Sequence, residues 1–388
     1  VVSSIQKFPA SRAMMLKPDG RPYLEGETIR LPDLAKTYRS IAREGTDWFY
    51  RGAFAERVGR WMQDNGGCIT AEDFANYRIR FREPVRTTYR GFEVVGFPPP
   101  SSGGTHVGQI LNVLEEFPLG QLLRERPAAG YHTIAEAMKI AFADRAHWLG
   151  DSDFANVPRG LVEKSYAQSL AKRIKQDGVV AVESHGLPPN WQDDLYGKHT
   201  THIAAADQEG NWVAITATVN TTFGSKVVVP GTGLVLNNEM DDFSSMPGSP
   251  NAFGLVGAEA NAVAPGKRPL SSMSPTIVLR DGKPVLTVGG AGGPKIITSV
   301  LLAIIRCIDA EMGVREAIAS PRFHHQWRPD KLFVERSMPT SDVENLRSLG
   351  HRIEFLSSAA VVQGIQRRSD GTFVGCADPR VPGKAAGY

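Results

Sequence analysis

A polar segment, residues 176–198, divides this sequence into two parts that favour different secondary structure. Before it, apolar side chains recur at helical spacing in four stretches, residues 31–44, 53–64, 105–117 and 131–149. After it, alternating apolar residues and short turns predict three β-hairpins, residues 202–207 with 212–218, 276–279 with 285–288, and 361–365 with 373–377. Helices followed by paired strands are consistent with two sheets flanked by helices.

Composition excludes several classes of protein. The 388 residues carry 44 basic and 41 acidic side chains, a net charge of +3, with no dense basic run that would bind nucleic acid. No apolar stretch reaches the roughly 18 residues of a membrane helix, and the longest, residues 296–308, contains Arg306. Three distant cysteines, Cys68, Cys307 and Cys376, match neither a disulfide framework nor a zinc site. Because the chain begins at Val1 without a signal-like core, we expect targeting information to lie outside it.

A threonine pair, Thr200-Thr201, follows the polar segment and precedes His202. A threonine hydroxyl is a poor nucleophile unless a base lies beside it, and cleavage of the chain before the threonine would supply its own α-amino group as that base. A polar linker is where a chain can be cut without damage to a core. The alternative is that the pair merely starts a strand, because threonine favours strands.

Polar residues also end the second strand of the first predicted hairpin. Thr218, Asn220 and the pair Thr221-Thr222 would lie beside the start of the first strand, where Thr200 is. Hydroxyl and amide groups there could orient a nucleophile and hold its amine. An ordinary polar hairpin end is the alternative.

Two further turns carry groups suited to a small charged ligand. The carboxylates of Glu239 and Asp242 follow the strand-like residues 234–236 and could bind an ammonium group, or form a solvated acidic turn. Their spacing matches no calcium loop. Ser271 and Ser272 offer hydroxyl groups to a carboxylate, or belong to an ordinary turn.

A glycine run, residues 289–293, precedes the apolar helix predicted at residues 296–312. Bare N–H groups at such a place suit an oxyanion, and the run lacks the Gly-Lys-Ser/Thr ending of a nucleotide loop. The alternative is a simple turn from strand to helix. The adjacent His324 and His325 point in different directions without an evident third ligand, so we interpret them as structural and expect neither a metal nor a cofactor.

The order of these motifs resembles the γ-glutamyltranspeptidase family. The resemblance rests on six segments that occur in the family's order: Thr200-Thr201-His202, Asn220-Thr221-Thr222-Phe223-Gly224, Leu236-Asn237-Asn238-Glu239-Met240-Asp241-Asp242-Phe243, Arg268-Pro269-Leu270-Ser271-Ser272-Met273-Ser274-Pro275, Gly292-Gly293 and Pro321-Arg322-Phe323-His324-His325-Gln326-Trp327. Upstream, residues 98–104 and Ala143-Asp144-Arg145 resemble the family's large subunit, so the resemblance covers nearly the whole chain.

The resemblance implies an α+β fold, the four-layer αββα sandwich of the N-terminal-nucleophile hydrolases. It implies self-cleavage of a proenzyme between His199 and Thr200. Residues 1–199 would be the C-terminal part of the large subunit, mostly helical and ending in the polar linker. Residues 200–388 would be the small subunit that carries the catalytic threonine, and together the two would form one αββα domain.

The resemblance also implies a role for each site residue. Thr200 would attack a γ-glutamyl amide, supported by Thr218, and the N–H groups of Gly292 and Gly293 would form the oxyanion hole. The α-amino group of the substrate would be held by Asn220, Glu239 and Asp242, and its α-carboxylate by Ser271 and Ser272. Glutathione is the expected donor, water or an amino acid or peptide the acceptor, and a periplasmic or secreted location is expected.

Two departures from the family pattern matter. The family's large subunit has more sequence before the region that matches Val1, including an arginine that grips the substrate carboxylate, so we assign no arginine to that role and expect this chain to be a fragment. The loop of residues 247–254 resembles the family's lid, with Phe253 where several members have tyrosine. The competing interpretations are a glutaryl (cephalosporin) acylase of the same family, which would not need Asp242, and an unprocessed binding protein without a free threonine amine.

Overall fold

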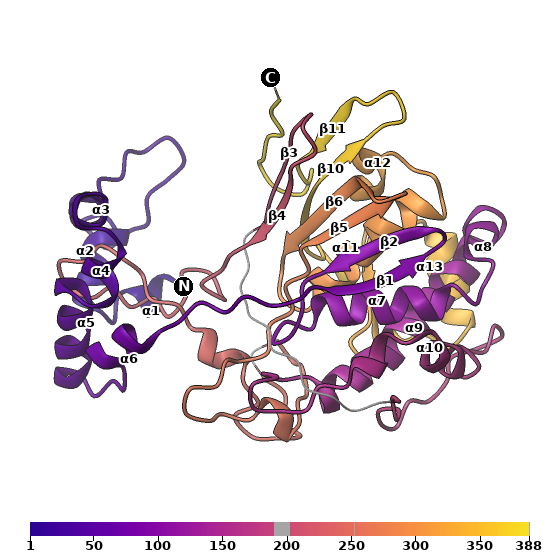
Figure 1. Ribbon diagram of the computed structural model, residues 1–388, viewed down its shortest axis with the longest axis horizontal. Helices are drawn as coiled ribbons and strands as arrows, with labels where there is room; N and C mark the ends of the chain where they lie inside the picture. Colours follow the sequence, from indigo (N-terminus) through magenta and orange to yellow (C-terminus); the bar gives the residue numbers. More distant parts are fainter. Residues whose placement is uncertain (190–201, 252, 388) are drawn as a thin grey trace. The chain divides into compact units, whose positions relative to one another are not determined.

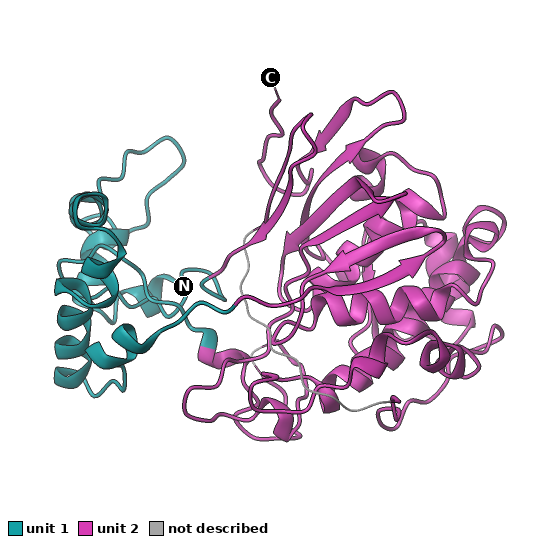
Figure 2. Cartoon of the chain, in the orientation of Figure 1, with its two compact units in different colours: residues 1–80, 219–239 teal, residues 81–218, 240–388 magenta. Residues whose placement is uncertain are grey.

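The computed structural model describes residues 1–189, 202–251 and 253–387. Two compact units are distinguished by their internal contacts, and Figure 2 colours them separately. They comprise Val1–Arg80 with Val219–Glu239, and Phe81–Thr218 with Met240–Tyr388. The subunit boundary predicted at His199–Thr200 lies outside the described residues and stays a prediction.

The first unit is helical. Its helices are α1 (Val2–Ile5), α2 (Pro9–Met15), α3 (Pro32–Glu44), α4 (Thr46–Tyr50), α5 (Ala53–Asp64) and α6 (Ala71–Asn76). Phe54 and Val58 of α5 pack with Val229 in a small core. The hydroxyl of Thr37 on α3 donates to the carbonyl of Thr232 at 2.7 Å, so the later segment is held to the helices by both apolar and polar contacts.

The start of α6 is stabilised by its capping residues. Thr70 accepts a hydrogen bond from the backbone N–H of Asp73, and the Asp73 carboxylate accepts from the backbone of Thr70. This reciprocal pair satisfies two N–H groups that a helix start leaves without partners. The boundaries predicted for α3 and α5 are confirmed, since both begin within one residue of the expected position and end at it.

The second unit is built on a six-stranded antiparallel sheet with the order β1-β2-β5-β6-β10-β11 (Figure 1). Its strands are β1 (Val85–Tyr89), β2 (Phe92–Gly96), β5 (Thr276–Arg280), β6 (Lys283–Ala291), β10 (Val361–Arg367) and β11 (Phe373–Cys376). The sheet therefore joins two strands from before the polar segment to four from after it.

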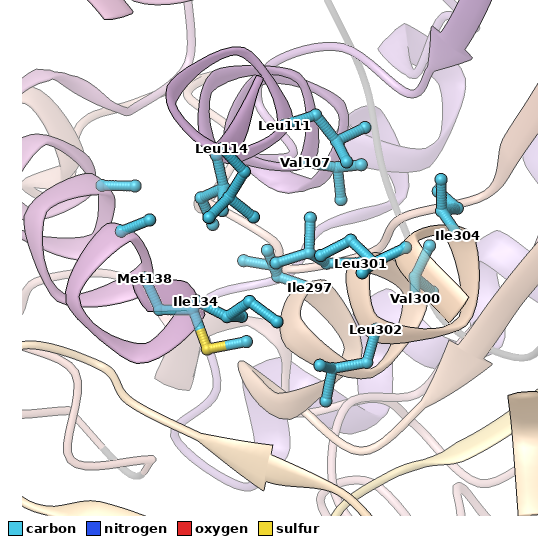
Figure 3. Close-up of a cluster of buried hydrophobic side chains, with 14 of the residues drawn as sticks. Val107, Leu111, Leu114, Ile134, Met138, Ile297, Val300, Leu301, Leu302 and Ile304 are labelled. Atoms are coloured by element: carbon cyan, nitrogen blue, oxygen red, sulfur yellow. The ribbon is translucent and has the colours of Figure 1, made fainter. Parts of the chain in front are cut away.

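Three helices form one layer beside this sheet: α7 (Gly103–Leu114), α9 (Pro127–Trp148) and α11 (Lys295–Ile308). Their apolar side chains interdigitate in a fully buried cluster, which Figure 3 shows with side chains of all three helices pointing toward one another. Each buried Leu, Ile or Val contributes about 1.5–3 kcal/mol by leaving water. This cluster is the main core of the second unit.

The predicted hairpin of β3 (His202–Ala206) and β4 (Trp212–Thr216) packs on the other face of the sheet, against β6 and β10. The His202 ring lies directly over Gly289 of β6: a Cβ atom there would come within 2.2 Å of the ring. On the outer face of the hairpin, Ile203 and Ile215 are 57% and 49% exposed. The predicted αββα sandwich has four layers. Within the described residues, the three helices, the six-stranded sheet and the hairpin form three of these layers.

The remaining elements surround this core. A small sheet contains β7 (Phe323–His324), β8 (Leu332–Glu335) and β9 (Ile353–Leu356), with β8 and β9 parallel and joined through α13 (Thr340–Ser348). The other helices are α8 (Leu119–Glu125), η1 (Arg159–Val162), α10 (Lys164–Ala171), η2 (Glu239–Asp242), η3 (Glu259–Asn261) and α12 (Val314–Ala319). In the described ranges, no helix is long and apolar enough to cross a membrane.

Strand β1 was not predicted, because its turn lacks the usual signal. Arg90 and Gly91 connect β1 to β2, and both have positive φ, 51° and 80°. Such a two-residue turn normally carries Asn-Gly or Asp-Gly. Arg90 tolerates the conformation here because its guanidinium group donates to backbone carbonyls at the end of α7, those of Leu114, Glu115 and Phe117.

The first part of the expected linker is anchored rather than free. The backbone N–H of Val180 donates to Glu136 at 2.9 Å, and that of Gly186 donates to Asp144 at 2.7 Å. The carbonyl of Val182 accepts from the Trp327 indole at 2.7 Å. Residues 180–186 of the predicted polar linker are therefore anchored, because polar side chains of α9 and the Trp327 indole hold their backbone.

The close packing of His202 on β6 gives a test of the hairpin layer. Gly289→Ala is expected to lower the free energy of unfolding by about 1–3 kcal/mol, the usual effect of forcing extra atoms into a packed core, because the new methyl group overlaps the His202 ring. Urea denaturation measures the change. Gly313→Ala is the matched control, since no atom lies within 4 Å of its Cβ position; equal effects of the two substitutions would contradict this packing.

Candidate active site

Two segments that lie far apart in the sequence are hydrogen-bonded to each other, residues 98–104 at the start of α7 and residues 271–274 before β5. The backbone N–H and hydroxyl groups of Ser102 both donate to the carbonyl of Ser271, at 2.9 and 2.8 Å. The N–H of Ser271 donates to the carbonyl of Pro100 at 2.8 Å. We call these segments the paired turns.

The paired turns approach so closely that side chains are excluded between them. The Ser101 hydroxyl donates to the Met273 carbonyl at 2.7 Å, and a Cβ atom on Gly103 would lie 1.9 Å from that carbonyl oxygen. Only glycine fits such an approach without displacing the backbone. Predicted substrate-binding residue Ser271 is thus held by buried backbone contacts.

Arg145 of α9 joins the paired turns to the predicted acidic group. Its side chain is nearly buried, with 4% exposure, and it donates to the hydroxyls of Ser102 at 2.9 Å and Ser272 at 3.2 Å. Burial lowers the pKa of Arg145 to about 10, and the negative charge of Asp242 opposes that shift. Arg145 is therefore a permanent cation that is hydrogen-bonded to Ser272 and influenced by the charge of Asp242. The sequence alone assigned no arginine to this site.

Asn261 is a second residue that the sequence did not single out. Its amide nitrogen donates to the carbonyl of Asp242 at 2.8 Å, and its amide oxygen accepts from the N–H of Leu270 at 2.9 Å. Asn261 thereby connects the backbone of one predicted site residue to the residue just before Ser271. A single asparagine at the end of the short helix η3 has no sequence signal that would have revealed this role.

The other predicted amine-binding residues belong to the first unit. Asn220 adopts a φ of 73°, which asparagine tolerates better than most residues, and its amide donates to the carbonyl of Asn238 at 3.0 Å. The Asn238 side chain accepts from the N–H and hydroxyl of Thr221, both at 3.0 Å. Glu239 follows, buried and at the start of η2. Asn220 and Glu239 are therefore neighbours through Asn238.

The glycine run has a different structure from the one predicted. Strand β6 continues through Ala291, so Gly289 and Gly290 are strand residues and not part of a loop before the helix. Only Gly292 and Gly293 form the turn into α11, with φ of 146° and 62°. A Cβ atom on Gly293 would lie 2.9 Å from the ring of Phe253, so the predicted lid residue rests on a predicted oxyanion residue.

His202, the first residue of β3, is the first described residue after the predicted nucleophile in the sequence. Its ring is 6% exposed, Nδ1 lies 3.0 Å from the Thr216 hydroxyl, and burial lowers its pKa to about 4. Thr218 follows the end of β4 by two residues. The predicted nucleophile Thr200 and the cleavage partner His199 lie outside the described residues.

Known proteins are similar to this chain in sequence and in fold. A family model described as Gamma-glutamyltranspeptidase matches residues 1–388. The chain is 45% identical over 380 residues to a "Glutathione hydrolase proenzyme" of Escherichia coli (strain K12), covering 97% of this chain and 65% of that protein. It is 37% identical over 379 residues to "Acylase ACY 1 proenzyme" of Pseudomonas sp. (strain SE83), covering 96% of this chain and 63% of that protein.

Among solved structures, the cephalosporin acylase from Bacillus halodurans is similar, with a TM-score of 0.84 and 28% identity over 96% of this chain and 65% of that chain. The fold is thus the α+β fold of the N-terminal-nucleophile hydrolases. The chain belongs to the γ-glutamyltranspeptidase family. It spans slightly less than two thirds of the length of these relatives.

The buried His202 predicts a loss of stability in mild acid. Its folded-state pKa, about 4, is below the ordinary value of 6.5, so the unfolded chain binds a proton first as the pH falls. The contribution of His202 to the free energy of unfolding is complete above about pH 6.5. It falls by about 3 kcal/mol as the pH is lowered toward 4. Denaturation at several pH values should show a smaller loss in His202→Gln than in the parent protein; equal pH profiles would contradict this assignment.

Proposed function

We propose that the protein is a γ-glutamyltransferase and glutathione hydrolase that uses Thr200 as its nucleophile after cleavage between His199 and Thr200. The observation that carries the proposal is that Arg145 donates to the Ser272 hydroxyl and is close enough to Asp242 to feel its negative charge. An α-amino acid presents one negative and one positive group on a single carbon. A cation with hydroxyls beside a carboxylate complements those two charges.

Chain connectivity supports the role of Thr200. His202 is the second residue after Thr200, and two residues of chain span at most about 7 Å. His202 packs on Gly289 of β6, and Gly292 follows three residues along the same strand and its turn, about 10 Å at the usual strand rise. In this proposal the hydroxyl of Thr200 attacks a carbonyl held at Gly292 and Gly293.

The chemistry follows from these positions. The freed amine of Thr200 accepts the hydroxyl proton as the oxygen attacks the γ-carbonyl carbon, and Thr218 supports the threonine. The N–H groups of Gly292 and Gly293 stabilise the oxyanion, an effect typically worth about 10²–10³ in rate for one donor. The leaving amine takes the proton, and a threonyl ester remains. Water then releases glutamate, whereas an amino acid or peptide amine takes the glutamyl group.

The remaining substrate contacts complete the proposal. Ser271 and Ser272 hold the α-carboxylate, while Asp242, Asn220 and Glu239 hold the α-amino group. Glutathione is the proposed donor, in keeping with the name of the Escherichia coli relative, a glutathione hydrolase proenzyme. We further propose that the two subunits arise from one precursor and that the protein acts in the periplasm or outside the cell.

A second candidate is an acylase that removes glutaryl side chains. The similarity to "Acylase ACY 1 proenzyme" and to a cephalosporin acylase structure favours it. A glutaryl group has the carboxylate of a glutamyl group but no α-amino group. The carboxylate of Asp242, held at its backbone by Asn261, would then have no substrate charge to bind, so we prefer the glutamyl donor.

Mass spectrometry and turnover together test the proposal. The purified protein is expected to contain two polypeptides split before Thr200 and to hydrolyse glutathione or a γ-glutamyl anilide. Thr200→Ala should abolish both, because it removes the nucleophile for cleavage and for turnover. A two-chain protein without turnover would refute the proposal, and a single intact chain that binds glutamate would indicate a binding protein instead.

Asp242→Asn distinguishes the two enzymatic candidates. The substitution keeps the shape but removes the charge that faces the donor ammonium group, so kcat/KM for a γ-glutamyl donor should fall about ten- to a hundredfold, the usual range for a charge-assisted hydrogen bond. Asp241→Asn, at the exposed neighbouring carboxylate, is the matched control. Unchanged γ-glutamyl turnover with glutaryl turnover present would instead support the acylase.

A further inference from the structure

The loop predicted as a lid, residues 247–254, forms a hairpin that continues to residue 257 and is braced by its own side chain. We call residues 247–251 and 253–257 the lid. Pro250 and Val256 form an antiparallel bridge. The Asn251 amide oxygen accepts from the N–H groups of Phe253 at 3.0 Å and Leu255 at 3.1 Å. Leu255 is buried in the main core. Among its described residues, the lid thus has a defined shape and an apolar anchor on one side.

Gln326, which is not part of the lid in the sequence, is hydrogen-bonded to it. Its amide nitrogen lies 3.4 Å from the carbonyl oxygen of Phe253, 3.2 Å from that of Gly254 and 3.3 Å from that of Arg328. Carbonyl oxygens only accept hydrogen bonds, so the nitrogen of the amide must face them. This fixes the amide oxygen toward His324 Nε2, 2.9 Å away.

The orientation of Gln326 is set by two buried groups. Because the amide oxygen only accepts, His324 Nε2 carries the hydrogen, and His324 Nδ1 accepts from the Thr298 hydroxyl at 2.9 Å. Burial lowers the pKa of His324 to about 3, so the ring stays neutral and keeps this tautomer near neutral pH. Thr298 belongs to α11, the helix that begins just after Gly293.

These contacts form a closed circuit around the glycine turn. Thr298 is hydrogen-bonded to His324, His324 to Gln326, and Gln326 to the lid. Phe253 of the lid in turn contacts Gly293, where a Cβ atom would be 2.9 Å from the phenyl ring. The helix that follows the glycine turn therefore also fixes the side chain that covers it.

We propose that Gln326 is a positioning residue, which holds the lid so that Phe253 covers Gly293 and controls how water and acceptor amines reach the acyl-enzyme. The reaction part of this proposal rests on the proposed function, but the tether itself does not. The hydrogen bonds of Gln326 are to His324, Phe253, Gly254 and Arg328, none of which has a proposed role in the chemical step. Gln326 acts through the backbone carbonyls of Phe253 and Gly254.

Hydrogen–deuterium exchange of the purified protein tests the tether without reference to activity. In Gln326→Glu a carboxylate faces three carbonyl oxygens, so exchange in peptides that cover the lid should rise above that of the parent protein. The difference should shrink as the pH falls, because a protonated carboxyl again donates a hydrogen bond. Gln326→Met, which has no donor, should raise exchange without recovery in acid.

Gln168→Glu on the exposed face of α10 is the matched control and should leave lid exchange unchanged. Unchanged exchange in both Gln326 variants would overturn the tether. Thermal denaturation of all variants verifies that they are folded, and the Met variant provides the test if the Glu variant does not fold.

Steady-state kinetics test the consequence for the reaction. A released lid should change the ratio of transfer to hydrolysis and raise the donor KM roughly two- to tenfold, the range for one ordinary hydrogen bond, with a smaller change in kcat. Raised exchange with unchanged kinetics would overturn the control of access while the tether stands. A parent protein without turnover would refute the proposed function, and the exchange measurement would still decide on the tether.

Discussion

The rest of the site depends on the close contact between the paired turns. One turn begins α7 and the other precedes β5, so their mutual hydrogen bonds join the helical core to the segment that carries Ser271 and Ser272. The contact is possible because Gly103 has no side chain. Breaking it would leave buried donors and acceptors without partners, at a cost of about 1–3 kcal/mol for each group. Arg145 reaches both turns and reinforces the contact.

Burial determines the charge of the groups near the candidate site. His202 and His324 are driven to the neutral form, because burial lowers their pKa values to about 4 and about 3. Arg145 remains a cation, since even a pKa of about 10 is far above neutral pH. The site therefore keeps a constant pattern of charge around neutral pH. A binding site for an amino acid benefits from such preorganisation, because the protein need not reorganise when the substrate arrives.

Local patterns in the sequence predicted most elements of the second half and many of the first. The hairpin β3–β4 and helices α5 and α11 follow from apolar spacing and turn residues. The predictions were wrong or incomplete where tertiary contacts replaced a local signal. Arg90 occupies a turn position that usually needs asparagine or aspartate, and the side chains of α9 hold residues 180–186, which by composition are a linker. The prediction for the glycine run was wrong because Gly289 lies within β6, where the His202 ring of the packed hairpin leaves no room for a side chain.

The sequence by itself determined the family, the order of the motifs and the candidate nucleophile, because these depend on residue types in a fixed order. It also indicated Ser271, Ser272 and Asp242 as ligands for a charged substrate. Only the tertiary structure revealed Arg145, Asn261 and Gln326. Arg145 and Ser272 are 127 positions apart, and Gln326 and Gly254 are 72 apart. Such contacts depend on how helices and loops pack. A single arginine, asparagine or glutamine that makes one leaves no pattern in the neighbouring sequence from which the contact could be predicted.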